Sequence, residues 1–363
     1  MPSRTHASSA YMEFAKLRSA ARYNLATSGI MSYPLAGLPV TLGDLEINGP
    51  TMYGYAGLLK RLAARNGVST DCVTTAAGTS MANHLSLAAT LEPGDEALVE
   101  HPTYELLVST LEYLGVTIQY FDRRLQDGFR VDVAEVERKI TPKTRLIVLT
   151  NLHNPTGAYI DEATLSEIGE VSTRHQAYVL VDEVYLEAMY DERPRPAIHL
   201  GEQFLVTSSL TKAFGLSGLR CGWVLANPEL TGRMRHINDL YGVNAAFPAD
   251  LLSVIAFDNL DRVSERAKKV LEANRPLLDA FLRSRSDLEY LLPKFGTIVF
   301  PKLLSGSVDT LDRLLREKYE TAIVPGSYFD MPQHFRIGMG GDPEMTREAL
   351  QRLGAGLDEM KIL

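Results

Sequence analysis

The stretch Ser208–Trp223 reads SSLTKAFGLSGLRCGW, and the pattern of the rest of the chain is organised around it. It follows the apolar run Phe204–Val206, which is typical of a strand buried on both faces of a parallel sheet. Small polar residues then lead to Lys212 and to a glycine-containing turn. Open α/β sheets bind their ligands at the carboxyl ends of the strands. The stretch therefore predicts that Lys212 lies in a ligand site at the edge of a sheet.

Strand and helix patterns alternate on both sides of this stretch. They predict seven strands, near residues 72–76, 96–100, 116–121, 145–150, 178–182, 204–208 and 221–226. Several of these runs are almost continuously apolar, which indicates a mostly parallel sheet wrapped by helices. We therefore expect an α/β fold with one large domain at residues 46–265. The N-terminal segment, 1–45, and the C-terminal part, 266–363, are expected to form a smaller α+β domain.

Helical patterns are also visible outside the sheet. An amphipathic helix is expected within about the first 25 residues, with Tyr11, Phe14 and Leu17 on its apolar side. A long helical stretch at residues 251–282 would carry the chain to the second domain. Further helices are expected near residues 309–320 and 343–360.

The composition is that of an ordinary globular protein. Of the 363 residues, 45% are hydrophobic and 23% are charged, and the net charge is −8. Without a basic cluster, this charge argues against nucleic acid and anionic membranes as partners. The only cysteines, Cys72 and Cys221, lie in apolar runs, which argues against a disulfide framework and against a metal site. The sequence shows neither a membrane span nor the apolar core of a signal peptide, so a cytoplasmic location is expected.

Two polar features stand at strand ends. Gly78, Thr79 and Ser80 lie between a predicted strand and a predicted helix, where backbone N–H groups can receive a phosphate. A plain helix cap is the alternative, since threonine and serine also cap well. Asp182 ends a hydrophobic strand, and a carboxylate there is costly unless it is paired. Glu183 is one position out of phase and should face the other way.

Four motifs together carry a resemblance to a known family. They are the lysine stretch itself, HNPTG at His153–Gly157, VDEVY at Val181–Tyr185, and Arg220. In their residues, order and separations they resemble the fold-type I aminotransferases, the class I/II enzymes of the aspartate aminotransferase superfamily, which use pyridoxal 5'-phosphate (PLP). A looser resemblance runs from about Gly29 to Arg336, which is most of the chain.

The resemblance implies a role for each motif in binding the cofactor. Lys212 would form a Schiff base with PLP, and Asp182 would pair with the pyridine nitrogen. Tyr104 would lie flat on the ring, while Asn154 and Tyr185 would donate hydrogen bonds to the ring's 3'-oxygen. Tyr104 could alternatively be a core tyrosine. The resemblance also implies a phosphate cradle made by Gly78, Thr79, Ser80, Ser209 and Arg220.

The resemblance further implies how the substrate and a second subunit would be held. Arg336 would clamp the substrate's α-carboxylate, with Asn154 nearby. Gly29 and Ile30 would lie beside that carboxylate, although an ordinary connecting loop is an equal alternative. Family members also carry a tyrosine that reaches the phosphate of the neighbouring subunit, which implies a homodimer with shared active sites. Tyr53 and Tyr55 both qualify, and their spacing does not choose between them.

The function implied is amino-group exchange between an amino acid and a 2-oxo acid, with Lys212 moving a proton at the substrate's Cα. A PLP-dependent lyase or cyclase is the alternative, because the same residues serve both chemistries. A cofactor-binding regulatory domain fused to a DNA-binding module is disfavoured, because the N-terminal segment is too short for a helix-turn-helix domain.

The sequence also bears on the substrate's side chain. Relatives that act on aspartate often use a second arginine from the segment after the last strand of the large domain. Here that segment, Ile237–Pro248, contains no arginine, and Tyr241 and Phe247 offer apolar surface instead. We therefore expect a neutral or aromatic amino acid to be preferred over aspartate. Four other arginines remain alternatives as partners for a distal carboxylate: Arg18, Arg22, Arg233 and Arg235.

Overall fold

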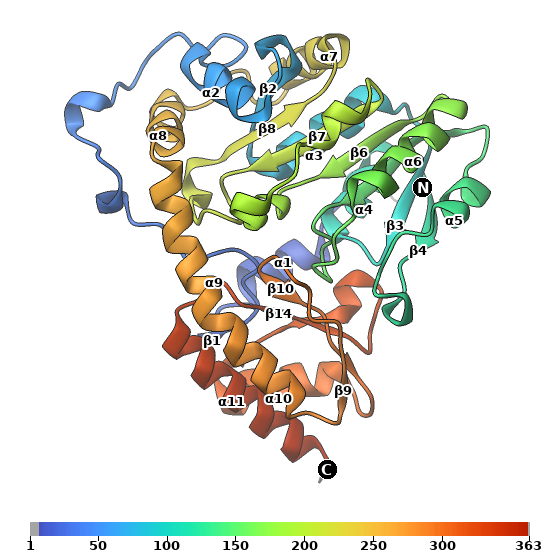
Figure 1. The fold of residues 1–363 in the computed structure, drawn as a ribbon, viewed down its shortest axis with the longest axis vertical. Coiled ribbons are helices and arrows are strands. Elements are labelled where there is room, and N and C mark those ends of the chain that lie inside the picture. Colours follow the sequence, from blue (N-terminus) through green and yellow to red (C-terminus); the bar gives the residue numbers. More distant parts are fainter. Residues whose placement is uncertain (1–6, 362–363) are drawn as a thin grey trace.

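The computed structural model describes residues 7–361. The seven predicted strands form one sheet in the order β2-β8-β7-β6-β5-β3-β4, which confirms the expected α/β fold (Figure 1). The strands are β2 (Val73–Ala77), β3 (Glu96–His101), β4 (Thr117–Asp122), β5 (Thr144–Thr150), β6 (Tyr178–Asp182), β7 (Phe204–Ser209) and β8 (Cys221–Leu225). Within this sheet β8 alone runs opposite to the other six strands, since it is antiparallel to both β2 and β7 while the remaining pairs are parallel. The residue that precedes β8 therefore lies at the same edge as the carboxyl ends of the parallel strands.

Helices cover both faces of the sheet, as the apolar strands require. Successive residues of a strand point to opposite faces of the sheet. Val181 belongs to the hydrophobic cluster on one face and Leu180 to a separate cluster on the other. The helices of this part are α2 (Ala56–Asn66), α3 (Gly78–Thr90), α4 (Glu105–Leu114), α5 (Val133–Lys139), α6 (Glu162–Arg174), α7 (Pro228–Asp239) and α8 (Phe247–Asp258). Both faces of the sheet are thus packed against helices, and the strand ends are left as the place for a ligand site.

The other elements lie below the sheet in Figure 1 and share a hydrophobic cluster of their own. The long helix α9 (Leu260–Arg283) leads into them, followed by α10 (Val308–Tyr319) and α11 (Pro343–Met360). Short strands complete this part: β1 (Tyr23–Asn24), β9 (Leu288–Glu289), β10 (Ile298–Val299), β11 (Lys302–Leu303), β12 (Thr321–Ala322), β13 (Val324–Pro325) and β14 (Phe335–Gly338). Because β1 pairs with β12, the N-terminal segment packs with the C-terminal part. The domain bounds at residues 45/46 and 265/266 stay a prediction.

The first helix, α1 (Ala10–Leu17), is shorter than expected. The Ser9 side chain caps it by accepting a hydrogen bond from the backbone N–H of Met12, 3.1 Å away. Tyr11 and Phe14 are buried, but Leu17 is 72% exposed, so the expectation that it shares the apolar side was wrong. The helix ends at Leu17, and no further turn continues the apolar face there. Residues 1–6 of the predicted N-terminal helix lie outside the described residues.

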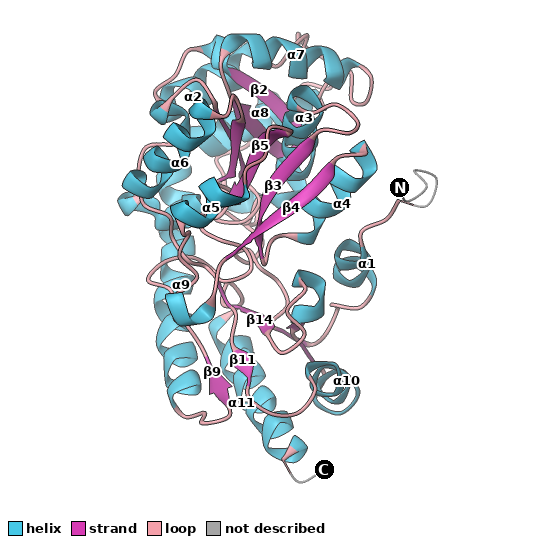
Figure 2. Ribbon diagram, turned by 90° about the vertical axis from the view of Figure 1, so that its right-hand side faces the viewer, coloured by secondary structure: helices cyan, strands magenta, loops and turns pink. Residues whose placement is uncertain are grey.

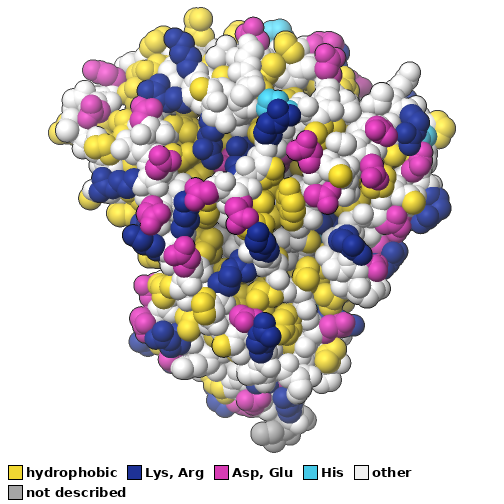
Figure 3. Space-filling view, viewed as in Figure 1, with side chains coloured by type: hydrophobic (Ala, Val, Ile, Leu, Met, Phe, Trp, Pro, Cys, Tyr) yellow, Lys and Arg dark blue, Asp and Glu magenta, His cyan; other side chains and the backbone are white. Residues whose placement is uncertain are grey.

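Short 3-10 turns join the longer elements. They are η2 (Leu35–Gly37), η3 (Leu42–Asp44), η4 (Thr70–Cys72), η5 (Leu125–Asp127), η6 (Leu186–Glu192), η7 (Ala197–Leu200), η8 (Ser217–Leu219) and η9 (Gly326–Phe329). On the face drawn in Figure 3, acidic and basic side chains are interspersed and no region of one sign stands out. Among the helices of residues 7–361, none is both long and apolar enough to cross a bilayer.

A buried ion pair joins strand β3 to the segment after β4. Arg123 Nη1 lies 2.7 Å from Glu100 Oε2, and both side chains are fully buried. The other carboxylate oxygen of Glu100 accepts hydrogen bonds of 2.6 Å from the backbone N–H and the hydroxyl of Thr150. A buried pair of this kind is costly to break because the remaining charge keeps no partner.

We expect Glu100→Gln to lower the free energy of unfolding by about 3 kcal/mol, because Arg123 would remain buried and charged without its counter-ion. Chemical denaturation would measure this change. The matched control is Glu137→Gln, which removes the partner of Arg174 in a pair that is half exposed on both sides. That change should cost less than about 1 kcal/mol. An equal cost for the two variants would contradict the argument.

Candidate functional site

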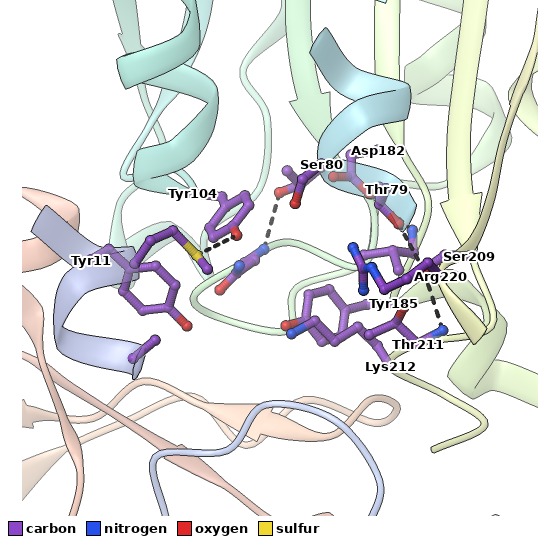
Figure 4. Close-up of a pocket in the computed structure, with 15 residues that line it drawn as sticks. Tyr11, Thr79, Ser80, Tyr104, Asp182, Tyr185, Ser209, Thr211, Lys212 and Arg220 are labelled. Carbon is purple, nitrogen blue, oxygen red and sulfur yellow. Dashed lines mark hydrogen bonds between the residues drawn. The ribbon is translucent and has the colours of Figure 1, made fainter. Parts of the chain in front are cut away.

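A cavity of about 200 Å³ opens at the carboxyl edge of the sheet (Figure 4). It lies where β5, β6 and β7 end and where α3 begins, as expected for an open α/β sheet. Its lining comes from these strand ends, from the loops that follow them, and from α1. The lining residues are Tyr11, Met12, Ala15, Thr79, Ser80, Tyr104, Thr150, Asn154, Asp182, Val184, Tyr185, Ser209, Thr211, Lys212 and Arg220.

Lys212 follows β7 and extends its amine into the cavity. The Nζ atom donates a hydrogen bond to the Ser28 hydroxyl at 3.1 Å and lies 6.0 Å from the centre of the Tyr185 ring. The backbone of Lys212 is held from the other side, because its carbonyl oxygen accepts a hydrogen bond of 2.8 Å from the N–H of Ile30. A Cβ on Gly29 would lie only 3.1 Å from the same oxygen. Gly29 and Ile30 thus support Lys212 from behind and do not line the cavity.

Asp182 ends β6 and is almost completely buried. Asn83 Nδ2 donates to one carboxylate oxygen at 2.8 Å, and the backbone N–H of Val184 donates to the other at 3.1 Å. The Thr207 hydroxyl donates to Asn83 Oδ1 at 2.6 Å and thereby fixes the orientation of the amide. Burial raises the pKa of Asp182 to about 6, although these two donors oppose the shift. A cationic group in the cavity would therefore find a carboxyl that gains from pairing.

Glu183 points away from the cavity, as its position in the strand predicts. One of its carboxylate oxygens accepts a hydrogen bond of 2.8 Å from the backbone N–H of Ala197, and burial raises its pKa to about 7.

The N-terminus of α3 is left without a side-chain cap. Its N-cap residue is Ala77, and the Thr79 hydroxyl donates instead to Ser209 at 2.8 Å. The plain-cap alternative therefore does not account for Thr79. Arg220 donates to the carbonyl oxygen of Ala77 at 3.0 Å and remains exposed. Unpaired N–H groups and a guanidinium thus converge on one end of the cavity, which suits an anion.

Gly78 makes this arrangement possible. Its φ is +77°, and a Cβ there would lie 2.2 Å from Arg220 Nη2. Any side chain at this position would therefore displace the guanidinium.

Arg336 lies completely buried behind the cavity. Its Nη1 donates to Asn154 Oδ1 at 2.9 Å, and its Nη2 donates to the Tyr11 hydroxyl at 2.8 Å. Both partners line the cavity. Burial alone would raise the pKa of Tyr11, but the positive charges of Arg336 and Lys212 outweigh it and lower the pKa. A carboxylate that approached Arg336 would meet Asn154 and Tyr11 at the same place.

The loop that carries Asn154 is braced by the buried ion pair. The backbone N–H of Asn154 donates to the Thr150 hydroxyl at 3.0 Å, and that hydroxyl donates to Glu100. His153 is fully buried, with its two ring nitrogens 2.6 Å from the Thr156 hydroxyl and 2.8 Å from the Pro102 carbonyl oxygen. The HNPTG motif is therefore a rigid part of the site.

Several residues of the cavity were not found from the sequence. Tyr11, Met12 and Ala15 form one wall of it, whereas the sequence placed Tyr11 only on the packing side of a helix. Asn83 was also missed. An asparagine on the apolar side of α3 could have been recognised, because a buried polar side chain needs a hydrogen-bond partner. Ser28, which accepts a hydrogen bond from Lys212, was missed although it directly precedes Gly29, a residue that was predicted to lie in the site.

Two tyrosines that were expected to contact the cofactor's phosphate lie away from the cavity of their own chain. The Tyr53 hydroxyl donates to Asp239 at 3.3 Å, and the Tyr55 ring packs edge-on against Phe247 at 5.2 Å. Neither tyrosine lines the cavity of its own chain. Their expected role concerns a neighbouring subunit and stays a prediction.

We expect the free energy of unfolding of an Asp182→Asn variant, relative to that of the native chain, to rise between pH 4 and pH 7. The pKa of Asp182 is raised in the folded protein, so its stabilising contribution is present at low pH and is lost as the pH rises through about 6. The asparagine variant escapes that loss, which amounts to about 3 kcal/mol. Denaturation of the cofactor-free proteins at several pH values measures the difference.

Asp161→Asn is the matched control for this experiment. Asp161 caps α6, and the hydrogen bonds from Thr164 lower its pKa. Its difference from the native chain should not rise with pH. A flat difference for Asp182→Asn would show that burial does not control this carboxyl.

The cavity fits the chemistry of PLP, the expected cofactor. PLP presents an aldehyde, a ring nitrogen that can carry a proton, and a phosphate. The cavity presents the amine of Lys212, the buried carboxyl of Asp182, and the uncapped N-terminus of α3 beside Arg220. The collision of a Cβ at Gly78 with Arg220 shows that the anion-binding end leaves no space for a larger residue.

Comparison with known proteins supports this reading of the cavity. The family model for aminotransferase class I and II matches residues 46–353. The chain is 27% identical to capreomycidine synthase of Streptomyces vinaceus over 90% of this chain and 88% of that protein. It is 29% identical to an arginine–pyruvate transaminase of Pseudomonas aeruginosa, over 85% of this chain and 83% of that protein.

A solved structure extends the comparison to three dimensions. A PLP-dependent aminotransferase from Streptococcus suis superimposes with a TM-score of 0.90 at 26% identity, covering 96% of this chain and 97% of that one. Because the family model covers most of the sequence and the cavity supplies the groups that the cofactor requires, this chain belongs to the class I and II aminotransferase family of PLP-dependent enzymes.

Proposed function

We propose that this protein is an amino-acid aminotransferase that exchanges an amino group between a neutral or aromatic amino acid and a 2-oxo acid. The observation that carries the proposal is the meeting of Lys212 and Asp182 in one cavity, with Arg336 directly behind it. These three groups supply an amine, a buried carboxyl and a carboxylate-binding cation, which together with PLP would support proton transfer at the Cα of an amino acid.

The cofactor would be held at both ends. Thr79, Ser80, Ser209 and Arg220, with the backbone at Gly78, would bind the phosphate. Asp182 would hold a proton on the ring nitrogen, which a neighbouring anion favours. When bound, PLP supplies an electron sink that stabilises negative charge at the substrate's Cα.

The ring would be positioned by three further side chains. The carboxamide oxygen of Asn154 is engaged by Arg336, which leaves its amide nitrogen as a donor for the ring's 3'-oxygen. Tyr185 would donate to the same oxygen, and Tyr104 would pack against the ring's face. Both line the cavity.

The reaction would depend on how the substrate is oriented and on the transfer of the proton at its Cα. Arg336 and Asn154 would hold the substrate's carboxylate and so fix the orientation of the Cα–H bond. The amine of Lys212, once released from the cofactor, would act as the general base that moves the proton at Cα. The Ser28 hydroxyl, 3.1 Å from the amine in this structure, would be a hydrogen-bond acceptor for it once it is released.

The substrate preference rests on the arginines that the site lacks. Arg18 lies 4.0 Å from Glu13 and Arg22 lies 3.7 Å from Glu320, while Arg233 lies 2.5 Å from Glu229. Arg235 donates to the carbonyl oxygens of Thr70 and Val73. None of the four lines the cavity.

Tyr241 and Phe247 pack against His84 and Tyr55 and do not line the cavity of their own chain, so within this chain they offer the cavity no apolar surface. A distal carboxylate on the substrate would nonetheless stay unpaired at this site.

Cyclisation is the second candidate, because capreomycidine synthase is among the similar proteins. A cyclase would use the same Lys212, Asp182 and Arg336 to remove the proton at Cα. The two candidates differ in the product, since a transaminase releases a 2-oxo acid and a cyclase does not.

We expect the PLP-loaded protein to release the matching 2-oxo acid from phenylalanine or methionine about a hundredfold faster than from aspartate, because burial of an unpaired carboxylate costs a few kcal/mol. Release is measured with one amino acid at a time and no added 2-oxo acid. Lys212→Ala is the control and should release none. Faster release from aspartate or from arginine would contradict the substrate assignment, ammonia would indicate a lyase, and a ring-closed product would indicate a cyclase.

A homodimer with shared sites is also part of the proposal. Two segments carry exposed apolar side chains: Leu35, Leu42, Ile47, Met52 and Tyr53 in the first, and Leu240, Tyr241 and Val243 in the second. Tyr53 contacts Asp239, so the two segments adjoin each other, and the groove between them reaches Arg220 at the cavity. Exposed apolar surface of this extent is typical of an interaction site. A second copy would cover it.

We expect Lys212→Ala chains mixed with chains carrying both Tyr53→Phe and Tyr55→Phe to recover activity, because each hybrid dimer would contain one intact site. Activity is compared with that of each variant refolded alone, and sedimentation measures the assembly. The two single tyrosine variants, mixed in the same way, tell which tyrosine crosses the interface. A monomer, or no recovery in the double-variant mixture, would contradict shared sites.

A further inference from the structure

The cavity has two chemically different sides. In Figure 4 the polar groups Asp182, Ser209, Lys212 and Arg220 lie opposite Tyr11 and Tyr104. Of these opposing groups, Tyr11 comes from α1. Met12 and Ala15 of α1 also line the cavity, and the positions of these three residues share one face of a helix.

Helix α1 is fixed from three directions before any substrate binds. The Ser9 hydroxyl at its N-terminus donates to Glu105, the residue after Tyr104. Tyr11 accepts a hydrogen bond from Arg336, and the Phe14 ring packs at 4.9 Å against Tyr328. Figure 2 shows α1 between α4 and the lower elements. The wall is therefore held in place by contacts within the chain itself.

Apart from the Tyr11 hydroxyl, which is paired with Arg336, this wall presents apolar atoms to the cavity. Met12 Sδ lies 3.6 Å from the Tyr104 hydroxyl, and Ala15 adds only a methyl group. The charged residues of α1 lie outside: Glu13 has an exposed side chain, and Lys16 is exposed on the same outer surface. A charged group placed against Met12 would lose water and find no partner.

The position of the wall decides which part of the substrate meets it. Tyr11 contacts Arg336, the cation behind the cavity, while Met12 and Ala15 flank Tyr11 on the same helix. A substrate held by its carboxylate at Arg336, with its Cα toward Lys212, has α1 on the side away from the sheet edge. Its side chain is the part that remains to contact this helix.

We propose that α1 selects the substrate's side chain, with Met12 and Ala15 as the residues that favour apolar and aromatic side chains over charged ones. This inference rests on the proposed function for the placement of the carboxylate and of Cα. It goes beyond that function by assigning the selection to two residues of one short helix.

Unreactive acids test the selection without any turnover. 3-Phenylpropionate and succinate have the same carboxylate at one end and differ at the other, and calorimetry gives their dissociation constants on the PLP-loaded protein. The native protein should bind 3-phenylpropionate more tightly. In Met12→Arg the ratio of the two constants should move toward succinate by about tenfold or more, because the new guanidinium can pair with the distal carboxylate.

The matched control is Leu17→Arg. It places the same charge on the same helix, but Leu17 is 72% exposed and does not line the cavity. Its ratio should equal that of the native protein. If Met12→Arg moves the ratio no further than Leu17→Arg does, the assignment to Met12 is wrong.

A second variant tests the wall without introducing charge. Ala15→Phe should raise the dissociation constant of 3-phenylpropionate about tenfold and leave that of propionate unchanged, because only the longer acid reaches the wall. Equal weakening of both acids would overturn the assignment to Ala15. Since neither acid has an amino group, these results hold whether the protein transaminates, eliminates or cyclises.

Discussion

The site depends on the burial of one carboxyl group, Asp182, at the end of the central strand of the sheet. Asp182 is buried, and among residues 7–361 its hydrogen-bond donors are Asn83 and the backbone of Val184, so its ionised form is poorly stabilised. A positive charge in the cavity removes that disadvantage. The site is thus prepared for a cationic ring, and Thr207 and Asn83 fix the geometry of that preparation before anything binds.

Much of this organisation was predictable because it is local in the sequence. The strands are visible in the sequence as apolar runs. Asp182 ends one such strand, and Asn154 and Lys212 lie within four residues of the ends of two others. Contacts made across the fold were not predictable. Nothing near Tyr11 in the sequence indicates that it meets Arg336, since the two are brought together only when the N-terminal segment packs with the C-terminal part. Leu17 was misplaced because a helical period cannot tell where a short helix stops facing the core.

Membership of the family does not determine the type of reaction, because the residues that would bind PLP and move a proton are common to several reactions. The groups that would hold PLP and move a proton at Cα are the same for transamination and for cyclisation. What happens next depends on where the substrate's side chain lies and whether it can reach the reacting atoms. Those conditions are set on the side of the cavity that faces α1, where Met12 and Ala15 leave an apolar surface.

The origin of that surface in the chain has an evolutionary consequence. Helix α1 has 8 residues, precedes the entire sheet, and contributes none of its strands. Substitutions at Met12 and Ala15 can therefore accumulate without removing any hydrogen bond that holds Asp182 or Lys212. A chain built in this way can acquire a new substrate by changes in one short N-terminal segment, while the older chemistry at the sheet edge is inherited intact.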